Sequence, residues 1–141
     1  MIEDPSGVTV LTVVYIHQPP RVLLGQKKRD FGIGKWNGFG GKVEAGEDIL
    51  ACAVRETQEE VGLTPREPEK VGYLEFHYQS RNQLWQVHVF RTSEFEGEPR
   101  YNRHNSLQII KHGFGTPKTS APENCYCAWR ITHSLKFVHL F

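Results

Sequence analysis

Aspartate is scarce in this chain of 141 residues, and none follows Asp48. Residues 1–99 carry 11 Lys and Arg against 15 Asp and Glu, whereas residues 100–141 carry 6 Lys and Arg against Glu123 alone. The two parts therefore differ in net charge, −4 against +5, and the composition changes abruptly near Arg100. The whole chain has a net charge of +1, which gives no general electrostatic argument for binding nucleic acid or a membrane surface.

Cysteines and long apolar segments are also few. The three cysteines, Cys52, Cys125 and Cys127, form an odd set without a disulfide framework, as in proteins of the reducing cytosol. The longest uncharged run, residues 7–20, is too short and too β-branched to span a bilayer. The acidic start MIEDPSG lacks the basic and apolar regions of a signal peptide. We therefore expect one domain, monomeric and cytoplasmic, with mitochondria and nucleus as alternative locations.

The segment Asp48 to Val61 predicts a helix. It contains no Gly or Pro, it begins beside acidic residues, and Gly62 suits a left-handed stop. Strands are expected at Val8 to Ile16 and Arg21 to Gln26, and a hairpin at 70–79 and 84–92. Strands around one long helix, without regular βαβ alternation, favour an α+β fold with a mixed sheet.

Three carboxylates share one face of the expected helix. Glu56, Glu59 and Glu60 fall at positions i, i+3 and i+4. At a separation of about 5 Å and an effective dielectric near 20, each pair repels by roughly 3 kcal/mol unless a cation lies among them. Oxygen ligands select a hard divalent ion, and Mg²⁺ beside phosphates is the usual one. The alternative interpretation is a solvated acidic face, as at many Glu-rich helix ends.

A glycine-rich turn precedes this helix and favours the metal site over the solvated acidic face. Residues without Cβ in the run Gly38-Phe39-Gly40-Gly41-Lys42 let the backbone approach an ion or a phosphate closely. Arg55 lies next to the carboxylates, and we expect it to organise them by pairing with Glu47. The alternative for Arg55 is an ordinary surface ion pair.

The stretch GKVEAGEDILACAVRETQEEVGL, residues 41–63, resembles the signature of the Nudix hydrolases, which cleave pyrophosphate bonds in nucleoside diphosphate derivatives. The matching positions are Gly41, Glu47, Arg55, Glu56, Glu59, Glu60 and Gly62, closed by apolar Leu63. Thr57 stands where the family usually has an aliphatic residue, and we expect it to be half-buried. The resemblance implies a mixed sheet sandwiched between helices, with the Gly40 carbonyl as a further metal ligand.

Residues from about 8 to 99 resemble more closely the animal MutT-homologue branch, the oxidised-purine nucleoside triphosphate diphosphatases. The matches are RVLLGQKKRDFGIGKWNGFGGKVEAGE and VHVFRTSEFEGEP. Members hydrolyse substrates such as 8-oxo-dGTP and 2-oxo-dATP to the monophosphate and pyrophosphate. The substrate-binding residues implied by this resemblance are Asn37 at the purine, Thr12 and Lys27 at the nucleotide, Phe31, Phe76 and Trp85 as walls of the base pocket, and Phe39, Gly40, Gly41 and Lys42 at the phosphates.

Each of these assignments has a structural alternative. Phe76 and Trp85 could be core residues of the hairpin, and Asn37 could serve only as a turn residue before Gly38. Lys27, with the two basic residues after it, could belong to an ordinary solvated loop. Tyr78 stands where the branch tends to have Phe.

From Arg100 onward the resemblance ends. The branch continues with a further metal-binding Glu, a strand, a loop with Trp and two adjacent aspartates that read the oxidised base, and a C-terminal helix. Here RHN at 103–105 stands near the place of that Glu, and the tail has no Asp. We expect only residues 129–141 to pack as one more element, so that 1–99 form the core and 100–141 an atypical tail that completes it or is appended to it, with the C-terminal helix missing or replaced. An alternative exon, a shifted reading frame or a divergent but folded tail would each explain this.

A zinc site in the tail is a weaker hypothesis. Cys125, Cys127, His133 and His139 have suitable side chains, but a single residue separates the cysteines, whereas zinc sites commonly use two to four. We expect two free thiols instead.

The three carboxylates predict Mg²⁺ held by Glu56, Glu59 and Glu60, and the resemblance implies the Gly40 carbonyl as a further ligand and hydrolysis of oxidised purine nucleoside triphosphates as the reaction. Arg55 would organise the site, and either Glu56 or Glu60 would be the general base. Two alternatives stay open: a Nudix hydrolase with another substrate range, because the aspartate pair is missing, and a catalytically impaired variant that only binds nucleotide.

Overall fold

A computed structural model of the chain describes residues 6–28, 34, 36–100 and 105–111, and in them a mixed sheet is the main element. Its strands are β1 (Val8–Gln18), β2 (Arg21–Lys27), β3 (Trp36–Asn37), β5 (Glu69–Tyr78), β6 (Gln83–Thr92) and β8 (Asn105–Lys111). The order is β3-β2-β1-β6-β5, and β8 pairs with β2. β1 and β6 are parallel, and the other pairs are antiparallel. β4 (Thr64–Arg66) and β7 (Glu94–Glu96) form a separate antiparallel pair.

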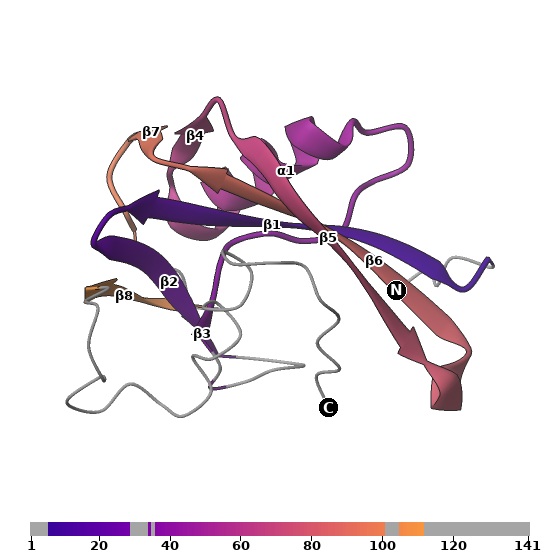
Figure 1. Cartoon of the computed structure of the whole chain (residues 1–141). Helices are drawn as coiled ribbons and strands as arrows, with labels where there is room; N and C mark the ends of the chain where they lie inside the picture. The colour runs from indigo at the N-terminus through magenta and orange to yellow at the C-terminus, as the bar shows by residue number, and fades with distance from the viewer. Residues whose placement is uncertain (1–5, 29–33, 35, 101–104, 112–141) are drawn as a thin grey trace.

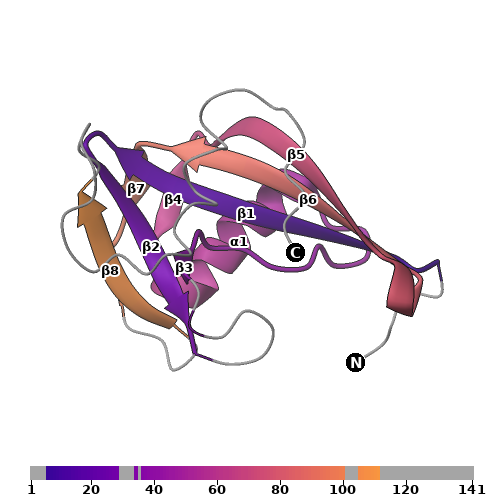
Figure 2. The same ribbon diagram turned by 60° about the horizontal axis from the view of Figure 1, so that its bottom comes forward.

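Helix α1 (Ile49–Val61) crosses one face of this sheet (Figures 1 and 2). The β-branched run in β1 alternates in burial, and its buried side chains face the helix. The apolar core formed between them consists of Val14, Ile16, Leu23, Phe39, Ala53, Val61, Leu63 and Phe90. This burial positions α1 and therefore the carboxylates on it.

The helix ends where its capping residues predict. The Asp48 side chain accepts a hydrogen bond from the Ala51 N–H at 3.1 Å, and Gly62 adopts the left-handed conformation with φ of 74°. The expectation of a half-buried Thr57 is wrong, because this side chain is fully buried. Its hydroxyl donates to the Ala53 carbonyl at 2.8 Å, so the polar atom is satisfied inside the core.

The predicted hairpin is confirmed as β5 and β6, which pair along almost their whole length. A 3₁₀ turn, η1 (Gln79–Arg81), joins them, and Asn82 follows it in the left-handed conformation with φ of 48°. Asparagine tolerates this conformation better than most residues, so the polar turn is suited to its place.

β8 corrects one expectation about the tail. Only residues 129–141 were expected to add an element, yet residues 105–111 pair with β2 at seven positions and lie beside it at the edge of the sheet (Figure 2). The prediction missed this strand because the resemblance to the family branch was taken to end at Arg100. The boundary at residue 99 stays a prediction, and the segment 112–141, with its two cysteines and two histidines considered for zinc, lies outside the described residues.

The α+β class with a mixed sheet is confirmed. Within the described part of the chain, α1 is the one α-helix, so a helical layer on the second face of the sheet stays a prediction. No helix among the described residues has the length and apolarity that a bilayer crossing requires.

The glycine-rich segment, residues 38–43, runs along β1 as an irregular sheet edge. β1 pairs with β2 only through residues 16–18, and beyond that point its free edge is taken by this segment. Val14 and Phe39 exchange two backbone hydrogen bonds, at 2.6 and 3.0 Å. Farther along, Thr12 N donates to the Gly41 carbonyl and Val43 N to the Val10 carbonyl, both at 2.9 Å. The sheet thus holds the segment against the helix that carries the carboxylates.

Candidate functional site

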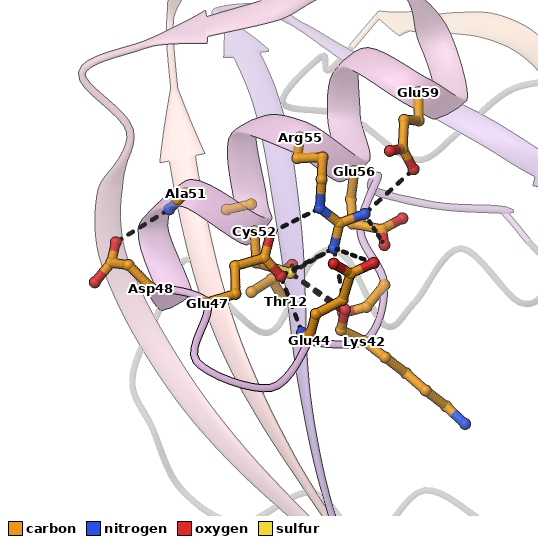
Figure 3. Close-up of polar contacts among 12 residues, drawn as sticks. Thr12, Lys42, Glu44, Glu47, Asp48, Ala51, Cys52, Arg55, Glu56 and Glu59 are labelled. Carbon is orange, nitrogen blue, oxygen red and sulfur yellow. Dashed lines mark hydrogen bonds and ion pairs between the residues drawn. The ribbon is translucent and has the colours of Figure 1, made fainter. Parts of the chain in front are cut away.

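Arg55 lies at the centre of a carboxylate cluster formed by α1 and the loop before it (Figure 3). Its Nε and Nη2 donate to the two oxygens of Glu47 at 2.6 and 3.0 Å, a bidentate pair. Its Nη1 donates to Glu56 Oε1 at 2.9 Å and to Glu59 Oε2 at 3.3 Å. Nη2 also reaches the Lys42 carbonyl at 3.3 Å. The predicted pairing of Arg55 with Glu47 is confirmed, and the guanidinium binds more than one acid at once.

The two carboxylates closest to Arg55 differ in their electrostatics. Hydrogen bonding to the guanidinium lowers the pKa of Glu47 to about 2, so this side chain stays ionised. Burial raises the pKa of Glu56 above its ordinary value, although Arg55 opposes the shift, and the charges of Glu59 and Glu47 add to it. Glu56 is therefore a carboxylate that a nearby cation would stabilise, and its raised pKa suits a proton acceptor.

Glycines at positions 40 and 41 let the backbone and the helix approach closely. A Cβ on Gly41 would lie 2.5 and 2.7 Å from the two carboxylate oxygens of Glu56. The Gly40 N–H donates to Glu60 Oε2 at 3.2 Å, and a Cβ on Gly40 would overlap the Thr12 carbonyl. The predicted contact between the glycine turn and the acidic helix face is therefore present, and it depends on the missing side chains.

The donors fit a hard divalent cation in chemical type, but they do not converge as a trio. Within the described residues, no group of three His, Cys, Asp or Glu side chains is arranged to hold a metal ion. Glu56 and Glu59 turn to Arg55, whereas Glu60 turns to the Gly40 N–H. Two features suit Mg²⁺. Gly41 keeps space open beside the Glu56 carboxylate, and carboxylate oxygens lie near a backbone turn.

Asn37 lies on the sheet face opposite α1. Its Oδ1 accepts a hydrogen bond from the Tyr15 hydroxyl at 2.6 Å and another from the Gly38 N–H at 2.8 Å. Tyr15 alternates with the buried Val14 on β1 and therefore points away from the helix. The bond from Gly38 is the turn-like contact expected of an Asn before Gly, whereas the bond from Tyr15 was not anticipated.

Three predicted substrate residues have side chains that the fold already uses or directs away. Thr12 is buried beneath α1, and its Oγ1 lies 3.5 Å from Cys52 Sγ. The Phe39 ring belongs to the core, so only its backbone lies in the glycine-rich segment. The Lys42 side chain extends away from the carboxylates (Figure 3), while its carbonyl accepts from Arg55.

The predicted aromatic walls share a face with Asn37 but lie at another level of the sheet. Phe76 and Trp85 are in register with each other and with Thr9, which is six residues before Tyr15 on β1. Six residues of strand span on the order of 20 Å, so the pair lies at a different level of the sheet from Tyr15, and its role as a wall of the base pocket stays a prediction. Tyr78 packs edge-on against Trp85 with ring centroids 5.0 Å apart. Lys27 is described only by its backbone in β2, and Phe31 lies outside the described residues.

A surface hollow of about 400 Å³ lies between β4 and the ends of β1 and β6, and one of its lining residues, Arg91, pairs in register with Tyr15. Two arginines line it, but Arg66 pairs with Glu96 and Arg91 with Glu69. Because both cations are already paired with acids, the hollow offers weaker chemistry than the helix and the glycine-rich segment.

Two contributors to the site were missed in the sequence. Tyr15 gave no signal because it lies within a run that reads only as a buried strand. Cys52 lies under the cluster, where its Sγ is 3.5 Å from the Lys42 carbonyl, and burial raises the pKa of its thiol. A neutral thiol of this kind is a packing residue, and its helical spacing with Arg55 was the available clue.

Comparison with known proteins agrees with this geometry. The oxidized purine nucleoside triphosphate hydrolase of Danio rerio is 53% identical over 90 residues, which are 64% of this chain and 58% of that protein. The protein of the same name from Mus musculus is 49% identical over 94 residues, 67% of this chain and 60% of that protein. The 8-oxo-dGTP diphosphatase of Escherichia coli is 41% identical over 61 residues, 43% of this chain and 45% of that protein. The match thus spans less than two thirds of these relatives' lengths.

Solved structures give the same result for the fold. A MutT NUDIX hydrolase from Burkholderia pseudomallei superposes with a TM-score of 0.69 at 27% identity, over 74% of this chain and 83% of that one. A mutator MutT protein from Bacillus halodurans superposes with a TM-score of 0.64 at 33% identity, over 73% and 68% of the two chains. Residues 6–111 match the NUDIX domain, a range that includes β8. With three quarters of its length inside that match, the chain belongs to the NUDIX family.

Proposed function

We propose that this chain is a Mg²⁺-dependent hydrolase that converts oxidised purine nucleoside triphosphates to the monophosphate and pyrophosphate. The observation that carries the proposal is the contact of Glu56 and Glu60 with Gly41 and Gly40 in a NUDIX-family chain. The names of the two vertebrate relatives and of the Escherichia coli protein supply the substrate class. We further propose that the protein acts as a cytoplasmic monomer.

The glycine-rich segment supports a binding mode for the nucleotide. Asn37 and Gly40 are three residues apart along an extended chain, which corresponds to about 10 Å. A base at Asn37 and phosphates at residues 40 and 41 would therefore be placed by one continuous piece of backbone. Phe31, Phe76 and Trp85 as base contacts, and Thr12, Lys27 and Lys42 as nucleotide contacts, stay predictions under this proposal.

The catalytic roles follow from the positions of the carboxylates. Glu56, Glu59, Glu60 and the Gly40 carbonyl would hold Mg²⁺, which when bound would neutralise phosphate charge and make a water more acidic. Arg55 positions Glu56 and Glu59 through its hydrogen bonds. Glu56 or Glu60 accepts the proton of the attacking water; the raised pKa favours Glu56, while the contact with Gly40 places Glu60 beside the segment.

Pyrophosphate release from 8-oxo-dGTP tests the proposal directly. We expect turnover with Mg²⁺ and none after chelation, and a loss on the order of 100-fold or more in both Glu56→Gln and Glu60→Gln. Glu69→Gln is the matched control, because Glu69 is an exposed acid on β5 paired with Arg91. Calorimetry with Mg²⁺ provides a second measurement that does not depend on turnover. Unchanged turnover in both Glu variants would rule out the mechanism.

Because no Asp follows residue 48, the assay should also compare oxidised with normal purine triphosphates. Rates with 8-oxo-dGTP and 2-oxo-dATP should be compared with those for dGTP and dATP. Equal rates would favour a NUDIX hydrolase of broader range. Nucleotide binding by folded protein without any turnover would favour the catalytically impaired variant.

A further inference from the structure

Tyr15 and Asn37 form a polar pair on the face of the sheet opposite the carboxylate cluster. The Tyr15 hydroxyl donates to Asn37 Oδ1 at 2.6 Å, a short hydrogen bond for this atom pair. Tyr15 comes from β1 and Asn37 from β3, and the two residues are 22 positions apart in the sequence. The contact therefore ties the start of the glycine-rich segment to the central strand of the sheet.

The second partner of Asn37 fixes which way its amide points. The Gly38 N–H is a backbone donor and cannot accept a hydrogen bond, and it lies 2.8 Å from Asn37 Oδ1. With the amide reversed, the Asn37 NH₂ group would face two donors, the Gly38 N–H and the Tyr15 hydroxyl in its present orientation. The orientation with Oδ1 inward thus follows from the chemistry of the neighbours and not from the assignment of O and N alone.

With its oxygen occupied twice, Asn37 has only donors left for a ligand. An amide free to rotate could contact a donor or an acceptor on a base, whereas an amide held in this way offers its Nδ2 hydrogens alone. We propose that Tyr15 is a positioning residue that holds Asn37 in this orientation, so that the site selects bases with a carbonyl oxygen at the contacted edge. The inference rests on the proposed function, because it assumes that a purine lies at Asn37.

Removing the hydroxyl tests the role of Tyr15. In Tyr15→Phe the amide would lose one of its two partners among the described residues and keep the Gly38 N–H. We expect the KM for 8-oxo-dGTP to rise about 3- to 10-fold, the range for one hydrogen bond, with kcat unchanged. The KM for dATP, whose base has no carbonyl, should change less. Tyr73→Phe is the matched control, since the Tyr73 hydroxyl also donates at 2.6 Å, to Glu75, and both residues belong to β5, away from Asn37 on β3. This control should leave both constants unchanged.

An Asn37→Asp variant tests the polarity of the contact. One carboxylate oxygen can still accept from Tyr15 and Gly38, and the other replaces the outward NH₂ group by an acceptor. We expect the ratio of kcat/KM for 8-oxo-dGTP over dATP to fall by at least about 10-fold, because a carbonyl oxygen would then face a second acceptor. A ratio that stays at the wild-type value would overturn the donor-only contact.

Side-chain NMR separates this inference from the proposed function. The ¹⁵N–¹H signals of the Asn37 NH₂ group report its mobility without any substrate, and their heteronuclear NOE should fall in Tyr15→Phe but not in Tyr73→Phe. If the wild type hydrolyses no purine triphosphate, the proposed function fails, while the NMR comparison still decides whether Tyr15 holds Asn37. An unchanged NOE together with an unchanged KM in Tyr15→Phe would show that the hydroxyl does not position the amide.

Discussion

Replacing Arg55 by Lys keeps the positive charge but removes the planar fork that binds several acids at once. Arg55 donates to Glu47 at 2.6 and 3.0 Å and to Glu56 at 2.9 Å. A lysine ammonium at the end of a single stem cannot occupy all three directions in the same geometry. The variant would leave at least one carboxylate without its partner, and the side chains of Glu47 and Glu56 are only 14% and 17% exposed.

The exposure of these side chains sets the expected loss in free energy of unfolding. Breaking a fully buried ion pair costs about 3–5 kcal/mol, and an exposed pair contributes at most about 1 kcal/mol. The Arg55 side chain is 27% exposed, so we expect the free energy of unfolding to fall by an intermediate amount, about 2–3 kcal/mol. Arg91→Lys is the matched control, because the Arg91–Glu69 pair has side chains 45% and 68% exposed and should lose less than about 1 kcal/mol.

Urea unfolding followed by circular dichroism measures both variants against the wild type. Equal slopes against urea in the three proteins would show that the comparison concerns stability and not the compactness of the unfolded state. A loss in Arg55→Lys no larger than in Arg91→Lys would show that Arg55 forms an ordinary surface pair. The reasoning that makes it the organiser of the carboxylates would then be wrong.

Three further predictions concern Gly41, Glu47 and the tail after Pro99. Gly41→Ala should lower kcat on the order of 100-fold, because the new Cβ would displace the Glu56 carboxylate. Gly72→Ala is the control and should leave kcat unchanged, because its Cβ would meet Val89 at an ordinary 3.5 Å. Equal kcat values in the two variants would contradict this prediction. Glu47, with a pKa lowered from 4.5 to about 2, contributes stability above pH 4.5 that is lost as the pH falls toward 2, so acid unfolding curves should be less steep in Glu47→Gln. Truncation after Pro99 removes β8 and should lower the Tm on the order of 10 °C by calorimetry, and an unchanged Tm would make the tail passive.

Local signals were enough to predict α1 and the β5–β6 hairpin. Asp48 and Gly62 cap the helix through bonds to residues within four positions, and such contacts can be read from a short stretch of sequence. The pairing of Arg55 with Glu47 was predictable for a similar reason, because helix spacing and the preceding turn bring residues eight positions apart together. In these cases the sequence distance is small and the chemistry is specific.

Contacts between distant segments were not predictable in the same way. The Tyr15–Asn37 bond joins two strands whose register depends on the whole sheet, and β8 pairs with a strand about 80 residues earlier. The burial of Thr57 depends on how closely α1 packs on the sheet, which its polar side chain does not indicate. Pattern reasoning assigns a residue to a face only after the neighbouring element is known.

The two sides of the candidate site are coupled through the glycine-rich segment. Phe39 anchors this segment in the core and exchanges two hydrogen bonds with Val14, so its path is set by β1 and not by a ligand. From this fixed path the Gly40 N–H reaches Glu60 on the helix side, while Asn37 meets Tyr15 on the other face. A side chain at position 40 would overlap the β1 backbone and shift both contacts together. Glycine is therefore required there by the sheet itself, and the distance between the carboxylates and Asn37 is a property of the fold.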